Sequence, residues 1–168
     1  IYGFPTLIAD FGDQLNSYDL SELKTLVDGY YGDGTALVGF AANSEVHEDA
    51  IVMRVAVKAA KAGKYRVGAW LLEDGIYGKQ TSAPDDSYNV HDHCIRLVDA
   101  ESHYMGHDLG MLSKGKPAEH IFTFKLDPEW NVDNCSVLLY VTSAAGSAQV
   151  VNNAVTVPVG KPVSYEYR

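Results

Sequence analysis

The sequence is poor in basic residues and lacks long apolar runs. Lysine and arginine together number 13 against 22 acidic residues, which gives the 168-residue chain a formal net charge of -9. A chain with this balance has no basic surface for nucleic-acid phosphates or anionic lipid headgroups, so we expect neither as a partner. None of its apolar runs approaches the roughly 20 residues that a membrane-spanning helix needs. These absences leave a globular chain of one domain, with or without a short appendage.

Cysteine is also scarce, and familiar catalytic motifs are missing. Two cysteines, Cys94 and Cys135, cannot form a dense disulfide framework, and the sequence leaves open whether they form one bridge or pack as free thiols. The chain contains no Cys-x-x-Cys pair, no Gly-x-Ser-x-Gly motif, no phosphate-binding loop and no Rossmann fingerprint. We therefore expect a protein that is not an enzyme and that binds no cofactor.

The N-terminus carries no recognisable targeting signal. The chain opens with Ile1-Tyr2-Gly3-Phe4-Pro5, without an initiator methionine and without the basic start and apolar stretch of a secretory signal. We interpret the chain as a processed or trimmed product, so this absence indicates no compartment.

What the sequence has in abundance is the pattern of β-strands. Eleven tyrosines and a valine-rich C-terminal part favour pleated strands. Apolar and polar residues alternate from Ile51 to Ala59 and from Tyr65 to Leu72, with a turn at residues 61–64 between them. The other predicted strands are Ala36–Ala42, Val90–Val98, Ile121–Leu126, Ser136–Ser143, Gln149–Pro158 and Val163–Tyr167. About eight short strands without intervening helices predict an antiparallel β-sandwich of immunoglobulin or fibronectin type.

The first 33 residues follow a different pattern. A short apolar run, Thr6–Phe11, precedes one amphipathic helix, Asp19–Tyr31, in which Asp19 is the N-cap and Glu22 lies at the capping-box spacing. One strand and one helix do not form a stable layer by themselves. We therefore predict a short α/β appendage over residues 1–33 and a β-sandwich domain over residues 34–168.

His91-Asp92-His93 is the sharpest candidate for a metal site. On a regular strand, residues two apart project from the same face, so His91 and His93 could bind one metal ion. Further ligands would have to come from elsewhere, and the candidates are His103, His107, Asp85 and Asp86. The plainer alternative places both imidazoles on an outer strand face, where they hydrogen-bond to neighbouring carboxylates or water.

The aromatic residues indicate a binding surface. Tryptophan and tyrosine join a broad apolar area to a polar tip, which suits the recognition of sugars and peptides. The candidates are Trp70, Tyr77, Tyr88, Tyr104 and Trp130. Trp70 stands in the middle of a predicted strand, where we expect it in the core, so the loop tyrosines are the better candidates.

Two stretches resemble a known family. The run Gly3–Asp10 resembles the segment of thioredoxin-like domains in which a cis-proline precedes a strand, and Asp19–Tyr31 then resembles the C-terminal helix of that fold. Downstream, several separated motifs are similar, in the same order, to the Omp28-related outer-membrane proteins of Bacteroidetes. These motifs are Trp70–Ile76, Gln80, Tyr88–Arg96, Val151–Ala154 and Val157–Gly160.

The resemblance implies a thioredoxin-like region followed by a C-terminal β-sandwich. It also implies export to the periplasm, the outer membrane or the cell surface, often through a lipid anchor that this chain does not contain. A binding or adhesion role is then expected, with a protein or a glycan at the cell surface as the ligand. The predicted ligand-binding residues are Tyr77, Gln80, Tyr88, His91, His93 and Arg96.

Two other functions stay open at this point. The chain could be the C-terminal fragment of a thioredoxin-like oxidoreductase whose redox motif lies upstream of Ile1, because only four residues precede Pro5 here. It could instead be a metal-binding domain that uses His91 and His93. The sequence identifies neither the ligand nor the oligomeric state.

Overall fold

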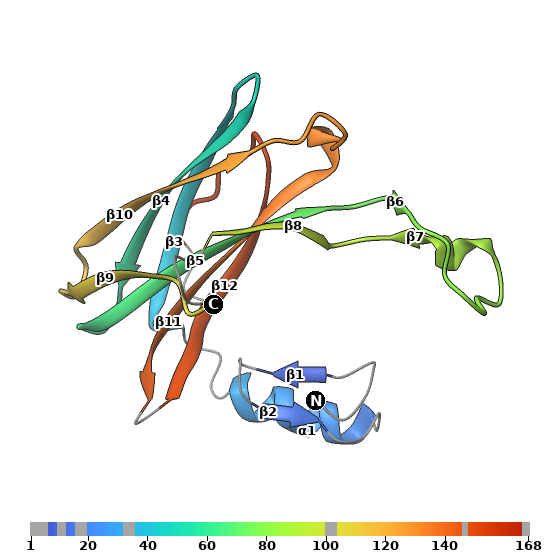
Figure 1. Ribbon diagram of the computed structural model, residues 1–168. Coiled ribbons are helices and arrows are strands. Elements are labelled where there is room, and N and C mark those ends of the chain that lie inside the picture. Colours follow the sequence, from blue (N-terminus) through green and yellow to red (C-terminus); the bar gives the residue numbers. More distant parts are fainter. Residues whose placement is uncertain are drawn as a thin grey trace.

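The structure, a computed structural model, describes residues 7–9, 13–15, 20–31, 36–99, 104–145 and 148–165. None of the helices in these ranges is long and apolar enough to cross a membrane. Figure 1 shows a strand-rich body, an arm that projects from it, and a small N-terminal group of elements outside the sheets.

The N-terminal group consists of two short strands and a helix. Strands β1 (Leu7–Ala9) and β2 (Asp13–Leu15) pair antiparallel, and helix α1 (Leu20–Tyr31) follows them. The predicted helix is confirmed. Strand β2 was not predicted, because three residues are too few to show an alternating pattern. The proposed N-cap, Asp19, lies outside the described residues.

Two antiparallel sheets form the body. The first has the order β10-β4-β3, with β3 (Val38–Val46), β4 (Ala50–Ala59) and β10 (Pro117–Lys125). The second has the order β12-β11-β5-β8, with β5 (Gly63–Glu73), β8 (Cys94–Asp99), β11 (Cys135–Ala145) and β12 (Ala148–Pro158). Strand β9 (His107–Leu112) pairs with the first half of β5, and β8 pairs with its second half. The prediction of a mainly β chain with antiparallel sheets and a short N-terminal helix is confirmed.

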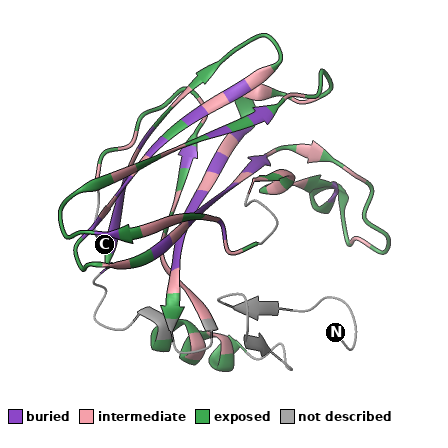
Figure 2. Cartoon of the chain, turned by 60° about the vertical axis from the view of Figure 1, so that its left-hand side comes forward, coloured by how far each residue is buried: buried purple, intermediate pink, exposed green. Residues whose placement is uncertain are grey.

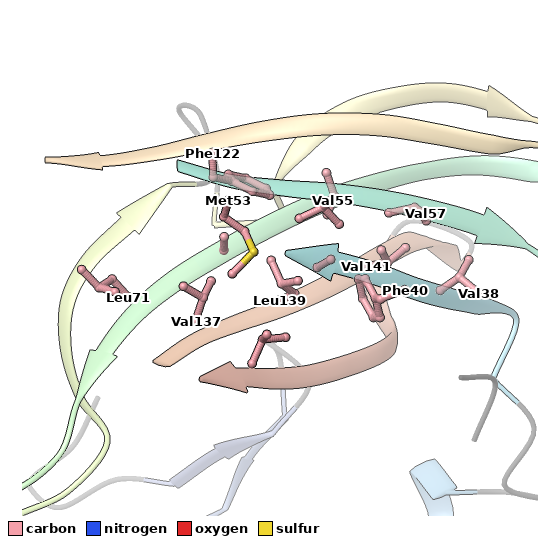
Figure 3. Packing of buried hydrophobic residues seen from close by; sticks show 14 of the residues in the cluster. Val38, Phe40, Met53, Val55, Val57, Leu71, Phe122, Val137, Leu139 and Val141 are labelled. Atoms are coloured by element: carbon pink, nitrogen blue, oxygen red, sulfur yellow. The ribbon is translucent and has the colours of Figure 1, made fainter. Parts of the chain in front are cut away.

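The core lies between the two sheets. Every second residue of β4 from Ile51 to Ala59 is buried, and so is every second residue of β5 from Tyr65 to Leu71. Phe122 and Phe124 of β10 are among the largest buried side chains on the inner face of the first sheet. Figure 3 shows Phe122 on the side of the first sheet and Leu139 and Val141 of β11 on the side of the second. The purple residues of Figure 2 follow this alternation along the strands. The period-two pattern therefore predicted which face of each central strand is buried.

Strand β3 extends four residues past its predicted C-terminal end, and β10 begins four residues before its predicted start. The structure differs more strongly from the predicted strands at three other places. Val90–Val98 is interrupted, so that only Val90–His91 (β7) and Cys94–Asp99 (β8) are strands. Strand β9 was missed because Gly110, at φ +69°, forms a bulge opposite Tyr65 and breaks the alternation. The predicted strand Val163–Tyr167 is represented by one bridge between Val163 and Ala42; its last two residues lie outside the described ranges.

A crossing segment, residues 104–106, lies on the outer face of the second sheet between β8 and β9. Three side chains from β5 and β11 hold its carbonyl groups. Tyr140 Oη donates to the carbonyl of Tyr104, Thr142 Oγ1 donates to that of Met105 at 2.9 Å, and Arg66 Nε donates to that of Gly106 at 2.7 Å. These bonds fix the path by which the chain enters β9.

Candidate functional site: a projecting arm and its anchored base

Residues 74–93 form an arm that extends the β5–β8 hairpin away from both sheets (Figure 1). Its stem is the pair β6 (Ile76–Tyr77) and β7 (Val90–His91), and a short 3-10 helix, Asp86–Asn89, lies near its tip. Tyr77 stands directly across from Val90 in this pair. Their side chains are 72% and 52% exposed, and Tyr88 is 50% exposed. The arm therefore carries three large apolar side chains that are open to solvent.

Asn89 organises the arm from within, and it is buried although it lies far from the core. Its side-chain oxygen accepts from the N–H of Gln80 at 2.9 Å, and its carbonyl accepts from the N–H of Gly78 at 2.8 Å. Its amide nitrogen donates to Asp86 Oδ1 at 3.3 Å. Since a buried amide is costly unless it is hydrogen-bonded, these contacts favour one shape of the tip.

The 3-10 helix near the tip begins at an N-cap aspartate. Asp85 accepts from the N–H and from the hydroxyl of Ser87. These hydrogen bonds hold the pKa of the exposed Asp85 carboxyl below its usual range. The cap therefore stabilises the turn that leads into Tyr88 and Asn89.

The base of the arm is tied by two carboxylates that reach across the hairpin. Asp74 Oδ1 accepts from the N–H of His93 at 2.6 Å, and Asp92 Oδ1 accepts from the N–H of Gly75 at 2.9 Å. His93 and Gly75 have φ values of +55° and +73°. This left-handed backbone explains why the predicted strand breaks between Asp92 and Cys94.

A buried carboxylate anchors the same base to the body. The Glu73 side chain is only 6% exposed; its Oε2 accepts from Arg96 Nε at 2.8 Å and its Oε1 from the N–H of Asn131 at 2.9 Å. The Arg96 guanidinium also lies 5.5 Å from the ring centre of Trp130. We call this group the Glu73 cluster. It joins β5, β8 and the loop that leads into β11.

The predicted binding residues fall into two groups. Tyr77, Gln80, Tyr88 and His91 lie on the arm, where the first three are exposed. His93 lies at the base, and the Arg96 side chain is held in the Glu73 cluster. The structure thus brings five of the six residues to the arm, with His93 at its base, and places Arg96 in a contact that supports it.

The strand geometry assumed for a metal site does not occur. His91 and His93 are separated by the break in the strand, and His91 Nε2 donates to the carbonyl of Gly78 at 2.8 Å. Among the residues that the structure describes, no group of three or more histidine, cysteine, aspartate or glutamate side chains could hold a metal ion. His103 lies outside those residues, while His107 contacts Asp99 at 2.7 Å and the ring of His120 at 4.4 Å.

The expectation that Trp70 lies in the core is wrong. Trp70 points to the outer face of the second sheet, on the opposite side of β5 from Val67 and Leu71, and is half-buried. It packs edge-on against Tyr140 at 5.8 Å. Gly68 makes room for that tyrosine, since a side chain at this position would overlap the Tyr140 ring.

Both cysteines are free thiols in the structure. Cys94 and Cys135 lie on the two strands that flank β5, and each stands opposite Glu73. Two strand spacings of about 4.8 Å separate them, which exceeds the roughly 7 Å that a disulfide spans between Cα atoms. Cys94 and Cys135 therefore form no disulfide bridge, a point that the sequence alone had left open.

The two thiols should differ in reactivity. Cys135 is 4% exposed, and burial, followed by the nearby Glu73 charge, raises the pKa of its thiol to about 11, whereas Cys94 is half-buried. We expect iodoacetamide at pH 8 to alkylate Cys94 in the folded protein and to leave Cys135 unmodified until the chain unfolds or the pH approaches 11. Peptide mass spectrometry would measure both sites, with Cys94→Ser as the control. Equal labelling rates in the folded state would contradict the expected difference.

Sequence reasoning missed the two residues that define this region. Asn89 has the sequence context of an ordinary polar loop residue, and Glu73, next to Asp74 at the end of a predicted strand, has that of a solvated turn residue. A signal was present for Glu73, because it continues the alternating buried positions of β5 beyond Leu71. For Asn89 the sequence offers no comparable signal, since the N–H groups of Gly78 and Gln80 that it accepts from are brought near only by the folded arm.

Comparison with solved structures shows a protein of similar fold. HBP35 of Porphyromonas gingivalis has a similar fold, with a TM-score of 0.76 at 19% identity; the match covers 96% of this chain and 54% of that one. The present chain therefore spans about half the length of that relative. A domain of the outer membrane lipoprotein Omp28 from the same organism matches 74% of this chain and 89% of its own, at 19% identity and a TM-score of 0.49.

The family follows from the sequence match. The chain belongs to the family described as Outer membrane protein Omp28, whose model matches residues 3–160. This confirms the resemblance noted in the sequence. A search of curated proteins gave no match.

Proposed function

We propose that the chain is a non-catalytic binding module of an exported, outer-membrane-associated protein, and that the projecting arm contacts its ligand. The ligand is a protein or a glycan at the cell surface. The body is a β-sandwich of immunoglobulin or fibronectin type over residues 34–168. Residues 1–33 are the end of a thioredoxin-like region. Membership of the Omp28 family supports the location, since this family is described as outer membrane proteins.

The proposal rests on one combination of properties: the arm exposes large apolar side chains, and hydrogen bonds hold its backbone in place. Large apolar side chains that stand exposed in a group mark interaction sites more often than scattered ones do. Tyr77 and Val90 stand opposite each other on the stem, and Tyr88 is exposed on the same arm. The contacts of Asn89 and the Glu73 cluster limit the motion of the arm, so that binding would cost little ordering of the backbone.

Tyrosine suits either kind of ligand. Its ring stacks on apolar side chains or on the apolar face of a sugar, and its hydroxyl accepts and donates hydrogen bonds at the rim of a contact. Gln80, which is exposed at the tip, adds an amide that can serve peptide groups or sugar hydroxyls. The arm therefore has the chemistry of a small recognition surface.

The test is a binding screen with matched variants. The purified chain is screened against outer-membrane and host-matrix proteins and against a glycan array, and each hit is measured by surface plasmon resonance. We expect the double variant Tyr77→Ala, Tyr88→Ala to lose at least about tenfold in affinity, because central tyrosines contribute more than 1 kcal/mol each, with an unchanged melting temperature. Met111→Ala, which removes a similarly exposed side chain from β9, is the control. No binding in the screen, or equal binding by the double variant, would contradict the proposed role.

A further inference from the structure

The outer face of the first sheet contains a hollow that is remote from the arm along the chain. Its volume is about 380 Å³. Two neighbouring rows of residues cross the sheet here. Ala41, Ala56 and Glu119 stand side by side on β3, β4 and β10, and Asn43, Arg54 and Ile121 form the next row. All six point away from the core, because the alternate residues Val55 and Val57 are buried.

The hollow exists because its centre is occupied by small side chains. Ala41 and Ala56 form the floor, while the longer side chains of Arg54, Glu119 and Ile121 surround it. The open edge of β3 is covered by Val163, whose N–H and C=O bond to Ala42 at 2.8 and 3.0 Å. This short C-terminal segment forms one wall of the hollow, so the site is bounded by three strands and one added backbone segment.

The polar side chains around the hollow are not used in the fold. Within the described residues, Arg54, Asn43 and Glu119 make no side-chain hydrogen bond and no ion pair. Lys58, two residues beyond Ala56 on the same face, lies 5.3 Å from the ring centre of Tyr165. A guanidinium, an amide and a carboxylate thus face one concave surface without partners of their own, in a chain whose net charge is -9.

The spacing of the two charges restricts the ligand. Arg54 stands opposite Ile121, and Glu119 stands opposite Ala56, so the two charged residues are diagonal neighbours across β4 and β10. Diagonal positions on an antiparallel pair lie about 7–8 Å apart. A ligand that contacts both side chains needs an anionic group for Arg54 and a hydrogen-bond donor for Glu119 at two separate positions. An α-amino acid carries its two charged groups on one carbon, and an inorganic phosphate offers no fixed donor for Glu119.

We propose that this hollow binds a carboxylated sugar. Arg54 forms a paired hydrogen bond with the sugar carboxylate, which matches the planar guanidinium. Glu119 accepts from ring hydroxyls on the far side, and Asn43 bonds to a hydroxyl beside the carboxylate. The methyl groups of Ala41 and Ala56 contact the apolar face of the ring. A volume at the small end of the range for ligand sites, about 300–1,000 Å³, suits one or two sugar rings.

Isothermal titration calorimetry on the full chain tests the site. The probes are galacturonate, glucuronate and their dimers, with galactose, glutamate and inorganic phosphate as the comparison ligands. We expect binding of the carboxylated sugars only. Arg54→Gln should weaken it at least about tenfold, since a charge-assisted pair is lost, and Ala56→Leu should abolish it by filling the hollow. Lys125→Gln removes one positive charge from an exposed position on the same strand as Glu119, so it should leave binding unchanged.

Several outcomes would overturn the assignment. These are no binding of any carboxylated sugar, equal binding of galactose, glutamate or phosphate, or unchanged affinity in both Arg54→Gln and Ala56→Leu. The Tyr77→Ala, Tyr88→Ala variant separates this site from the arm, because it should bind the carboxylated sugars as the unmodified chain does. Melting temperatures close to that of the unmodified chain would show that the variants are folded.

Discussion

Glu73→Ala should destabilise the folded chain by about 2–4 kcal/mol, because it removes both hydrogen bonds of a buried carboxylate, while its partner Arg96 is partly exposed and keeps access to water. The substitution leaves the Arg96 guanidinium without its acceptor and the N–H of Asn131 unbonded. Urea unfolding followed by tryptophan fluorescence would measure the loss, and Trp130 reports directly on the affected cluster.

Two variants make this expectation specific. Glu48→Ala removes an exposed glutamate from the loop between β3 and β4 and should change the free energy of unfolding by less than about 0.5 kcal/mol. Glu73→Gln keeps an acceptor for Asn131 but loses the charge that pairs with Arg96, so its effect should lie between the other two. A Glu73→Ala protein as stable as the Glu48→Ala protein would show that the cluster does not hold the arm to the body.

Gly106→Ala is the second substitution with a large expected effect, about 3–5 kcal/mol. Gly106 has a φ of +97°, and a side-chain carbon there would lie 2.5 Å from the backbone of Val67. The backbone of a central strand cannot move aside, so the crossing segment would have to lift. The left-handed strain costs about 1–2 kcal/mol, and each displaced hydrogen bond from Arg66, Tyr140 and Thr142 costs about 1 kcal/mol more.

Gly115→Ala is the matched control for this prediction. Gly115 also has a positive φ, +76°, but nothing lies within 4 Å of the position that its side chain would take. It should therefore lose only the left-handed strain of about 1–2 kcal/mol. Thermal unfolding of the two variants side by side would separate strain from contact, and equal losses would mean that the crossing segment is not pressed against β5.

The central strands could be predicted from the sequence because the alternation of buried and exposed residues is visible within each strand by itself. Burial on one face and solvent on the other impose alternation, and the residues of β4 and β5 show it directly. Strand β9 contributes only Leu109 and Leu112 to the core, and a register shift next to Gly110 places these two residues three positions apart, so the alternation cannot be recognised without knowing the partner strand. Alternation therefore does not identify a strand that contains a bulge, such as β9, which shares one edge of β5 with β8.

The candidate site was predictable only in part. The tyrosines of the arm could be selected because large aromatic side chains in a turn-rich stretch have no strand face to occupy. Trp70 was expected in the core because of its size and its place in the middle of a strand, although the alternation of Val67, Ala69 and Leu71 already puts it on the other face of β5. The hollow could not be predicted at all, since it requires the register of three strands and the position of Val163.

The division of β5 between two edge partners has a consequence for how this protein can change over evolutionary time. Its residues 63–73 touch β11 on one side and both β8 and β9 on the other, so a substitution there disturbs many neighbours at once. The turn between β6 and β7 is held by hydrogen bonds within the arm itself. Insertions, deletions and substitutions should therefore accumulate between residues 79 and 88. Changes there can alter ligand specificity without disturbing the packing of the two sheets.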